Sequence, residues 1–399
     1  MDLNYSPEDR AFREKTRRWL EANVPTQDLK TLAERKAWHR KLYEAGYVGM
    51  LWPTEYGGWG ATAMQQAIVQ DEMARIGAPA PVNEMGIGFT GPTIIGYGSE
   101  WQKERYLKAM LTADEIWCQL YSEPNAGSDL ASLATRAEDD GDAFRVTGQK
   151  IWTSSGPIAD WGILLARTDP RAPKHKGISC LLLNMRQPGV EVRTLRQITG
   201  SAHFAEVFMT DARADKRDLI GDLNRGWEIA QTTLGHERGL TAVGRAAAAF
   251  AQLVRAARTL TRAGRPLIDD PIVRAKLGAF YAELEVQRYA RLRVLSALQA
   301  GTSPGPAASL TKLSYTEFEK RAFDLALEIL GPWGQFADAR GEAFERVDTS
   351  MGGPGTWAAA FLWSRAGTIY SGSSEIQKNI IGERVLGLPK EVRADRLKA

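Results

Sequence analysis

The hydrophobic period of this 399-residue chain changes twice, and this change limits the possible folds more than any other sequence feature. Residues 1–115 place apolar side chains at helical spacing, and the serine, proline and acids of Ser6–Asp9 predict a capped first helix. Short segments rich in β-branched and aromatic residues fill residues 116–222, and helical spacing returns over 223–399. We therefore predict a multidomain α+β protein in which a middle β domain separates two helical domains.

The same patterns predict individual elements. Further helices are expected over Lys30–Ala45, Ala63–Ile76, Glu100–Leu111, Trp227–Arg262, Pro271–Ala300, Ser309–Leu330 and Glu375–Val385. Strands are expected over Ile116–Tyr121, Ser132–Ala137, Ala143–Trp152, Gly162–Arg167, Ile178–Met185, Val190–Gln197 and Glu206–Met209. The Asp139–Asp142 segment is typical of a hairpin turn, and the glycine-rich segment Gly331–Gly355 predicts a loop insertion. Strands at this spacing favour a barrel or sandwich, and the long helices that follow favour a bundle.

Composition excludes several classes of function. The 51 basic and 48 acidic residues leave a net charge of only +3, without the long basic run expected of a nucleic-acid binder. Two cysteines favour a reducing compartment over a disulfide framework, and the four histidines show no metal-ligand spacing. The sequence carries no signal-peptide pattern and no apolar run of membrane-spanning length. We expect a cytoplasmic protein without a metal site.

Two glycine patterns resemble a dinucleotide-binding motif but lack its context. Gly58–Ala63 and Gly353–Ala358 both read G-x-G-x-x-A. Neither follows a buried strand within a strand–helix–strand unit, which is what builds the phosphate-binding turn. A nicotinamide site is therefore not expected.

A more informative pair of segments lies in the β domain. Leu120–Asp129 reads LYSEPNAGSD, and Lys150–Gly156 reads KIWTSSG. The first forms a turn whose free backbone N–H groups and hydroxyls suit a polar ring edge or a phosphate. The second offers a tryptophan as a flat apolar wall. From chemistry alone, an ordinary loop beside a core tryptophan is the favoured explanation of both segments.

In their order and spacing, these segments resemble the flavin-binding motifs of the acyl-CoA dehydrogenase family. The carboxyl-terminal Thr368–Arg384, the opening helix, Gly98–Leu107 and Gly226–Arg238 are also similar to family sequence. The resemblance covers nearly the whole chain. It implies an N-terminal helical domain (1–115), a middle β-barrel domain (116–222) and a C-terminal four-helix bundle (223–399), with FAD as cofactor.

The resemblance also implies which residues contact the flavin. Trp152 would shield one ring face, Ser154 would bond near N5, and Tyr121 and Ser122 would lie near the reactive edge. The implied cofactor-binding residues are Gln119, Tyr121, Ser122, Gly127, Ser128, Trp152, Ser154, Ser373 and Glu375. The implied substrate-binding residues are Ser128, Arg238, Ser371 and Gly372.

The family reaction removes the α proton of an acyl thioester while a hydride leaves the β carbon for flavin N5. The usual carboxylate base follows the tyrosine of the carboxyl-terminal motif, where this chain has Ser371. A minority of the family carries the base on the first long bundle helix, before an arginine, and this chain has Glu237-Arg238 there. Leu234, Glu237, Thr241 and Gly244 share one helix face, so we assign the catalytic base to Glu237. A helix-surface ion pair of Glu237 is the alternative.

Three departures from the family pattern affect other contacts. Leu260–Leu267 replaces the segment that reaches the adenine half of FAD on a neighbouring subunit, where Arg262 or Arg265 could substitute. Glu328 stands where glutamine is expected and would repel a pyrophosphate. The insertion at Gly331–Gly355 precedes the catalytic motif and is expected to reshape the acyl pocket or a subunit contact.

The expected function is dehydrogenation of an acyl-CoA to the trans-2-enoyl-CoA, as in fatty-acid β-oxidation, with a branched or bulky acyl group favoured. The resemblance further implies a homo-oligomer (dimer or tetramer) and an electron-transferring flavoprotein as acceptor. Two alternatives stay open. One is a structural or half-site subunit of a hetero-oligomer, and the other is an acyl-CoA oxidase or flavin monooxygenase of the same fold.

Overall fold

The computed structural model describes residues 5–238, 243–300, 305–335, 347–349 and 353–390 of the chain. These residues divide into two compact units, one reaching Glu237 and the other holding Arg238–Thr349 with the residues from Pro354 onward. No helix in the described ranges combines the length and apolar character that a membrane crossing requires.

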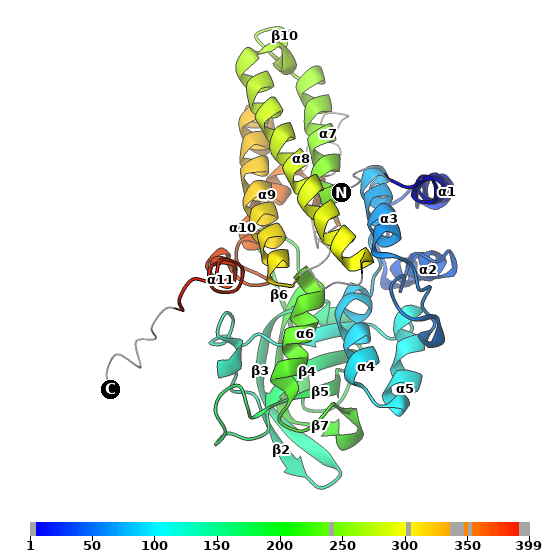
Figure 1. The fold of residues 1–399 in the computed structure, drawn as a ribbon, viewed down its shortest axis with the longest axis vertical. Coiled ribbons are helices and arrows are strands. Elements are labelled where there is room, and N and C mark those ends of the chain that lie inside the picture. Colours follow the sequence, from blue (N-terminus) through cyan, green and yellow to red (C-terminus); the bar gives the residue numbers. More distant parts are fainter. Residues whose placement is uncertain (1–4, 239–242, 301–304, 336–346, 350–352, 391–399) are drawn as a thin grey trace. The chain divides into compact units, whose positions relative to one another are not determined.

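The first unit begins with helices that the sequence predicted closely. Ser6 caps the first helix by accepting a hydrogen bond from the Asp9 N–H at 3.0 Å, and Thr31, Thr62 and Ser99 cap three later helices with capping boxes. The predicted helices are α1 (Pro7–Asn23), α2 (Leu32–Glu44), α3 (Ala63–Ile76) and α5 (Glu100–Leu111). The π-helical turn Gly86–Thr90 and α4 (Gly91–Tyr97) were not predicted. Figure 1 shows them in blue and cyan.

The middle of this unit is a mixed eight-stranded sheet with the order β6-β7-β3-β2-β4-β5-β8, beside which β1 pairs with β4 in parallel. The strands are β1 (Trp117–Leu120), β2 (Arg136–Asp140), β3 (Ala143–Ser154), β4 (Trp161–Arg167), β5 (Ile178–Asn184), β6 (Val190–Leu195), β7 (Phe204–Asp215) and β8 (Leu219–Ile220). The predicted hairpin is confirmed, because Asp140 pairs with Ala143 across a two-residue turn. Closure of the sheet into a barrel stays a prediction.

Two predicted strands differ from the observed ones by more than two residues at one or both ends, and each difference has a physical reason. The strand predicted from Ser132 begins only at Arg136, because the N–H groups of Ala134 and Thr135 donate to the Glu123 carboxylate instead of a neighbouring strand. The strand predicted as Glu206–Met209 extends over Phe204–Asp215. Its pairing with β3 continues past a bulge, where polar residues alternate with buried alanines.

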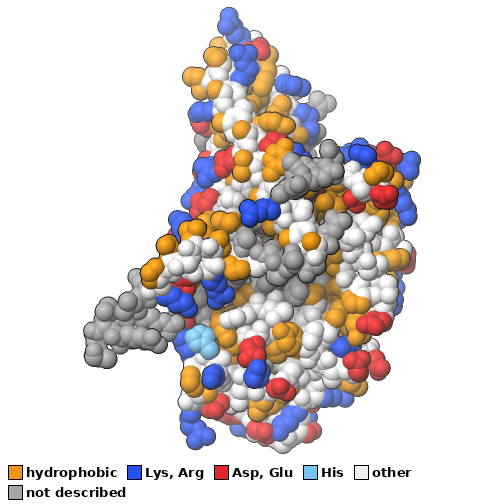
Figure 2. All heavy atoms as spheres, in the orientation of Figure 1, with side chains coloured by type: hydrophobic (Ala, Val, Ile, Leu, Met, Phe, Trp, Pro, Cys, Tyr) orange, Lys and Arg blue, Asp and Glu red, His pale blue; other side chains and the backbone are white. Residues whose placement is uncertain are grey.

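Aromatic packing joins the helices of this unit to its sheet. The Tyr106 ring on α5 lies edge-on to Trp117 of β1 and to Trp161 of β4, with centroids 5.3 and 5.0 Å apart. Trp117 and Trp161 stack at 5.8 Å. On the face shown in Figure 2, acidic and basic side chains are intermingled over the part that carries the sheet, as expected from the small net charge.

Helix α6 (Gly226–Arg238) follows the sheet and reaches the boundary between the units. The second unit is helical. It contains α7 (Val243–Thr259), α8 (Pro271–Gln299), α9 (Ala308–Leu330), α10 (Trp357–Gly367), α11 (Ser374–Ile380) and a π-helical turn at Ile381–Val385. Helix α9 contacts α7, α8 and α10, and Phe250, Phe280 and Phe318 form a stacked row between α7, α8 and α9.

The sequence predictions for this unit need two corrections. The helix predicted to end at Arg262 ends at Thr259, and β9 (Thr261–Arg262) pairs with β10 (Arg265–Pro266) in a hairpin. Left-handed backbone at Ala263 and Gly264 makes that turn, with φ of 52° and 78°. The predicted loop Gly331–Gly355 carries a 3₁₀ helix (Gly331–Gln335) and paired strands β11 (Val347–Thr349) and β12 (Gly353–Gly355), while residues 336–346 and 350–352 lie outside the described ranges.

Candidate functional site

The predicted flavin-binding turn lies directly after β1. Glu123 and Ala126 exchange two backbone hydrogen bonds of 3.1 Å and close the turn, so that Gly127 and Ser128 stand exposed beside it. The Tyr121 side chain is buried in the core of the unit. Contact of this tyrosine with a ligand would therefore have to come from its backbone.

A buried ion pair holds this turn against β3. The Lys150 ammonium lies 2.8 Å from Glu123 Oε1 and donates to the Tyr121 carbonyl at 3.1 Å. The Ile151 N–H also donates to the Ser122 carbonyl at 2.9 Å. Sequence reasoning missed this pair, although a lysine and a glutamate inside two ligand-binding motifs were available as a signal. The two predicted segments are thus brought together by side-chain and backbone bonds.

The ion pair changes the titration of both partners. Burial would raise the pKa of Glu123, but the Lys150 charge and the backbone N–H of Ala134 outweigh it and lower that pKa from 4.5. Burial lowers the pKa of Lys150 to about 8, and the attraction of Glu123 opposes this shift only in part. The carboxylate is the better-satisfied partner because it also accepts the N–H groups of Ala134 and Thr135.

Trp152 is presented outward by a strained segment of β3. It sits at the irregularity between Lys150 and Thr153 with a left-handed φ of 60°, and 58% of its surface is exposed. Left-handed backbone is unfavourable for a residue with a Cβ. A large apolar ring held outward by strained backbone is therefore a candidate ligand wall.

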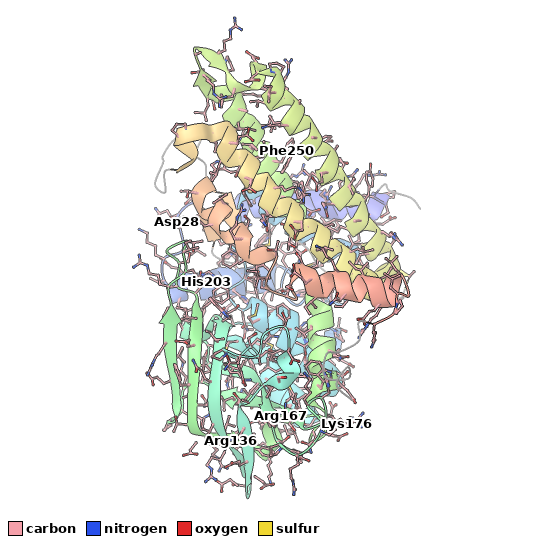
Figure 3. All side chains as sticks on the ribbon, turned by 90° about the vertical axis from the view of Figure 1, so that its left-hand side faces the viewer. Asp28, Arg136, Arg167, Lys176, His203 and Phe250 are labelled. Carbon is pink, nitrogen blue, oxygen red and sulfur yellow. The ribbon has the colours of Figure 1, made fainter. Side chains whose placement is uncertain are left out.

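Ser154 and His203 flank this tryptophan. Ser154 ends β3 opposite Phe204, whose ring meets that of Trp152 edge-on at 6.1 Å. The His203 ring lies 4.6 Å from that of Phe204, and burial lowers its pKa. Figure 3 shows His203 at one end of the sheet, away from Arg136 and Arg167 near the other end. His203 is a site neighbour that the sequence analysis did not single out.

Two donors on β1 and the turn that follows it fit the polar edge of a flavin ring. The buried Gln119 Nε2 on β1 has no hydrogen-bond partner among the described residues. Among the described residues, the Ser122 N–H also has no acceptor, because the backbone hydrogen bond of Ser122 is the one that its carbonyl accepts from Ile151. Isoalloxazine carries carbonyl oxygens and ring nitrogens as acceptors, so these donors suit it and would otherwise cost free energy.

The second unit holds the carboxyl-terminal site residues together. Ser371 and Gly372 are consecutive left-handed residues with φ of 55° and 84°. Ser373 then caps α11 by accepting a bond from the Ile376 N–H at 3.4 Å. The exposed Glu375 stands in the first turn, where the helix backbone and Ser373 lower its pKa.

Several of the predicted site residues lie wholly or partly outside the described residues. Glu237 and Arg238 lie in the last turn of α6, but their side chains, like residues 239–242, are outside the described part of the structure. The predicted helix face at Leu234, Glu237, Thr241 and Gly244 is thus described only at its start. The flavin-contact residues before residue 155 belong to one unit and those after residue 370 to the other.

The structure shows the surroundings of three residues that depart from the family pattern, Arg262, Arg265 and Glu328. Arg262 and Arg265 are directly opposite each other in the β9–β10 hairpin, and both are exposed. Like charges opposite each other in a ladder are destabilising without a counter-charge. Glu328 forms an ion pair with Lys276, which offsets the repulsion that the sequence predicted.

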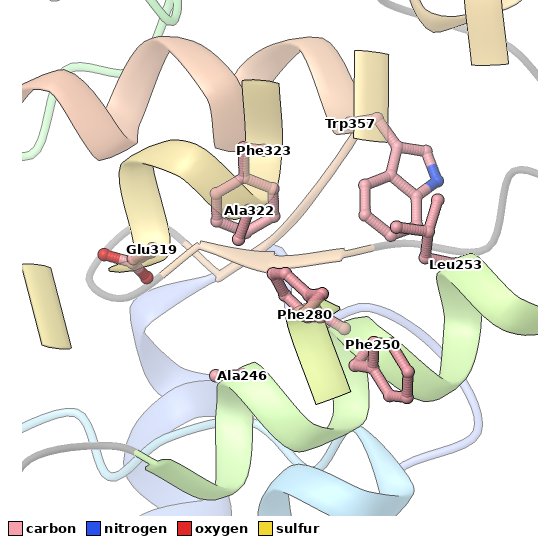
Figure 4. Close-up of a pocket in the computed structure, with 9 residues that line it drawn as sticks. Ala246, Phe250, Leu253, Phe280, Glu319, Ala322, Phe323 and Trp357 are labelled. Atoms are coloured by element: carbon pink, nitrogen blue, oxygen red, sulfur yellow. The ribbon is translucent and has the colours of Figure 1, made fainter. Parts of the chain in front are cut away.

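The helical unit also contains a small internal gap between α7, α8, α9 and α10 (Figure 4). Phe250, Phe280, Phe323, Trp357 and the buried Glu319 are among its lining residues. Its volume of about 20 Å³ has room for little more than a water molecule. This gap is therefore too small to be an acyl pocket.

Comparison with known proteins identifies the family. Residues 6–114, 118–216 and 224–386 match the models of the acyl-CoA dehydrogenase N-terminal, middle and C-terminal domains. The chain is 38% identical to the acyl-CoA dehydrogenase IpdE1 of Mycobacterium tuberculosis, over 96% of this chain and 98% of the relative. It is 34% identical to FadE34 of the same organism, over 88% of this chain and 46% of that protein.

Solved structures agree with this assignment. The ChsE4–ChsE5 complex from Mycobacterium tuberculosis contains a chain with a TM-score of 0.87 at 30% identity, covering 98% of this chain and all of that one. A steroid acyl-CoA dehydrogenase, Tcur3481–Tcur3483, has a TM-score of 0.86 at 29% identity with the same coverage. The fold and these relatives thus define a class of oxidoreductase. The chain belongs to the acyl-CoA dehydrogenase family, whose members depend on FAD.

Proposed function

We propose that this protein dehydrogenates an acyl-CoA thioester between its α and β carbons, with FAD as cofactor. The observation that carries the proposal is the outward Trp152, together with two donors unpaired among the described residues, Gln119 Nε2 on β1 and the Ser122 N–H of the turn that packs against the same strand, in a chain of this family. Bound FAD would accept the hydride at N5. The implied domain bounds (1–115, 116–222, 223–399), the barrel and the four-helix bundle belong to the same proposal.

The chain's own residues would divide the work between cofactor and substrate. Trp152 would cover one ring face, and Ser154, Ser373 and Glu375 would add polar contacts. The Ser371 N–H would donate to the thioester carbonyl, with Gly372, Ser128 and Arg238 at the acyl-CoA. Arg262 or Arg265 would reach the adenine half of FAD on a neighbouring subunit, because their opposed positive charges lack an anion in the hairpin.

We assign the base to Glu237, because Ser371 occupies the usual position and serine without a partner does not abstract a proton from carbon. The position of Glu237 at the end of α6 supports this role. A carboxylate desolvated by a bound thioester would be a stronger base than one in water.

A bulky acyl group is the substrate class that we favour. A structural relative at 29% identity is described as a steroid acyl-CoA dehydrogenase, and a base on the helix supports the same choice. An electron-transferring flavoprotein is the proposed acceptor. A cytoplasmic location stays a prediction.

A second candidate is one half of a hetero-oligomer. The two solved structures with the highest TM-scores reported above are two-component complexes by their names. In this case the chain would complete its site with a different partner chain rather than a second copy of itself.

Purification of the chain alone separates these candidates. A yellow homo-oligomer with bound FAD that is bleached anaerobically by a ring-bearing or branched acyl-CoA supports the first. Protein without FAD, or without bleaching until a second chain is added, supports the hetero-oligomer. Hydrogen peroxide formed in air at the turnover rate would indicate an oxidase and contradict the dehydrogenase.

A further inference from the structure

The turn at Ser371–Gly372 is held by two buried side chains from outside it. Lys312 on α9 donates to the carbonyls of Gly367 at 3.0 Å and Gly372 at 2.8 Å. Gln377 on α11 donates to the carbonyls of Ser371 at 2.9 Å and Gly372 at 3.3 Å. Lys312 is only 4% exposed and Gln377 is fully buried, so both are committed to this arrangement.

The turn needs such support because its backbone is unfavourable. Ser371 has a left-handed φ of 55°. This conformation is higher in energy for serine because its Cβ crowds the backbone, whereas Gly372 has no Cβ. A strained backbone conformation is kept only where several surrounding contacts hold it in place. Three of the four bonds from Lys312 and Gln377 converge on the carbonyls of Ser371 and Gly372, and the fourth reaches Gly367 before the turn.

Closeness to the turn gives Lys312 a second effect. Lys312 donates to two carbonyls in the buried interior, and a positive charge in a region of low dielectric acts over a longer range than one at the surface. The pKa of Glu375 is lowered chiefly by the helix backbone and by Ser373, and the positive charge of Lys312 contributes to the same shift. Negative charge that develops beside Ser371 would therefore be stabilised.

We propose that Lys312 and Gln377 are positioning residues that impose the left-handed conformation of Ser371 and so aim its N–H at the substrate carbonyl. This inference rests on the proposed function, because it assigns a thioester to the turn. The N–H donor would matter most when the carbonyl oxygen gains enolate charge after loss of the α proton. Lys312 would add a positive potential to the same place.

A β-keto acyl-CoA tests the inference without turnover. Such a thioester is not dehydrogenated at its α and β carbons, and its acidic α carbon forms an enolate with its own absorbance. The enolised fraction of the bound compound therefore measures how well the site holds negative charge on the carbonyl. Enolisation is measured whether or not any acyl-CoA bleaches the flavin of the wild type. Enolisation therefore tests the role of Lys312 and Gln377, while bleaching tests the proposed dehydrogenation.

The variants are Lys312→Met, which removes the charge and both bonds, and Lys320→Met, a matched control on the same helix. We expect Lys312→Met to keep its FAD and to lower the enolisation constant 10- to 100-fold, in line with loss of an oxyanion donor. Lys320→Met should stay within twofold of the wild type. A folded, FAD-loaded Lys312→Met protein with unchanged enolisation would overturn the proposal.

Two further variants separate positioning from a general loss of structure. Glycine adopts left-handed backbone without cost, so Ser371→Gly should reduce the effect of Lys312→Met when both are present. Lys312→Arg keeps the positive charge and the N–H donors, so its enolisation constant should be close to that of the wild type. This variant tests the proposal even if Lys312→Met does not fold. An arginine variant that folds and binds the β-keto thioester without enolising it, or a double variant as impaired as Lys312→Met, would refute the positioning role.

Discussion

The ammonium of Lys150 lies 2.8 Å from Oε1 of Glu123, and both side chains are buried beneath the turn that carries Ser122. Glu123 also accepts the N–H groups of Ala134 and Thr135, and Lys150 also donates to the Tyr121 carbonyl. Removing one partner leaves an unpaired charge in a dry interior, which is far worse than removing both.

We expect Lys150→Met to lower the free energy of unfolding by about 3–5 kcal/mol, while Lys150→Met with Glu123→Gln recovers most of the loss. Chemical denaturation of the apoprotein measures both. The exposed pair Lys216–Asp139, also 2.8 Å apart, is the matched control, and Lys216→Met should cost about 1 kcal/mol or less. Equal losses in both single variants would show that burial of the Lys150 pair is unimportant.

Glu237→Gln tests the proposed base. The variant should retain FAD and lose flavin reduction by acyl-CoA by about 10²- to 10⁴-fold, as expected when a general base is lost. Glu228→Gln is the control, because Glu228 lies on the same helix and forms an exposed pair with Arg225. Rapid-mixing absorbance gives the rate, and Ser371→Glu added to Glu237→Gln should restore part of it. Normal bleaching by Glu237→Gln would place the base elsewhere.

Trp152→Ala separates ligand binding from stability. Because the ring is 58% exposed, its loss should change the free energy of unfolding of the apoprotein by about 0.5 kcal/mol or less. Stacking of an aromatic side chain on a base is worth about 1–3 kcal/mol, so the FAD dissociation constant should rise about 5- to 150-fold. Flavin fluorescence titration measures it, with Trp59→Ala, another exposed tryptophan, as control. Unchanged affinity would remove Trp152 from the flavin site.

Arg262→Gln with Arg265→Gln tests the contact with the adenine half of FAD. Relief of the opposed charges should leave the stability of the apoprotein unchanged or raise it by about 0.2–1 kcal/mol. FAD affinity should nevertheless fall, and its dependence on salt concentration should weaken. Titration at two ionic strengths gives both quantities, and Arg258→Gln at the end of α7 is the control. An unaltered salt dependence would contradict the assignment.

His39 predicts an acid-sensitive stability. Burial lowers its pKa from 6.5 to about 4, and its Nε2–H donates to the Leu111 carbonyl at 2.9 Å, so the folded state keeps the neutral ring. The unfolded chain takes up the proton first as pH falls from 6.5 toward 4, and the free energy of unfolding should drop by up to about 3 kcal/mol in that window.

The matched variant is His39→Gln, whose amide can donate to the same carbonyl but does not titrate. Its stability curve should be flatter between pH 6.5 and 4 than that of the wild type, as measured by chemical denaturation at several pH values. Parallel curves for the two proteins would assign the acid sensitivity to other groups.

The sequence by itself determined the order of the elements and many of their ends. Helix α3 has the bounds that its periodicity predicted, Ser6 caps α1, and the hairpin turn follows Asp140. These features depend on backbone preferences and on contacts a few residues apart, which a single sequence displays directly. The match to the acyl-CoA dehydrogenase family also followed from ordered local motifs.

Only the tertiary structure decided which polar residues support the site. Lys150 meets Glu123 from 27 residues away, and Lys312 meets Gly372 from 60 residues away. Periodicity carries no information about such partners, because a buried charge is satisfied by whatever the fold brings beside it. For the same reason the strand predicted from Ser132 lost its first residues: their N–H groups bind the Glu123 carboxylate, a partner that only the folded chain provides.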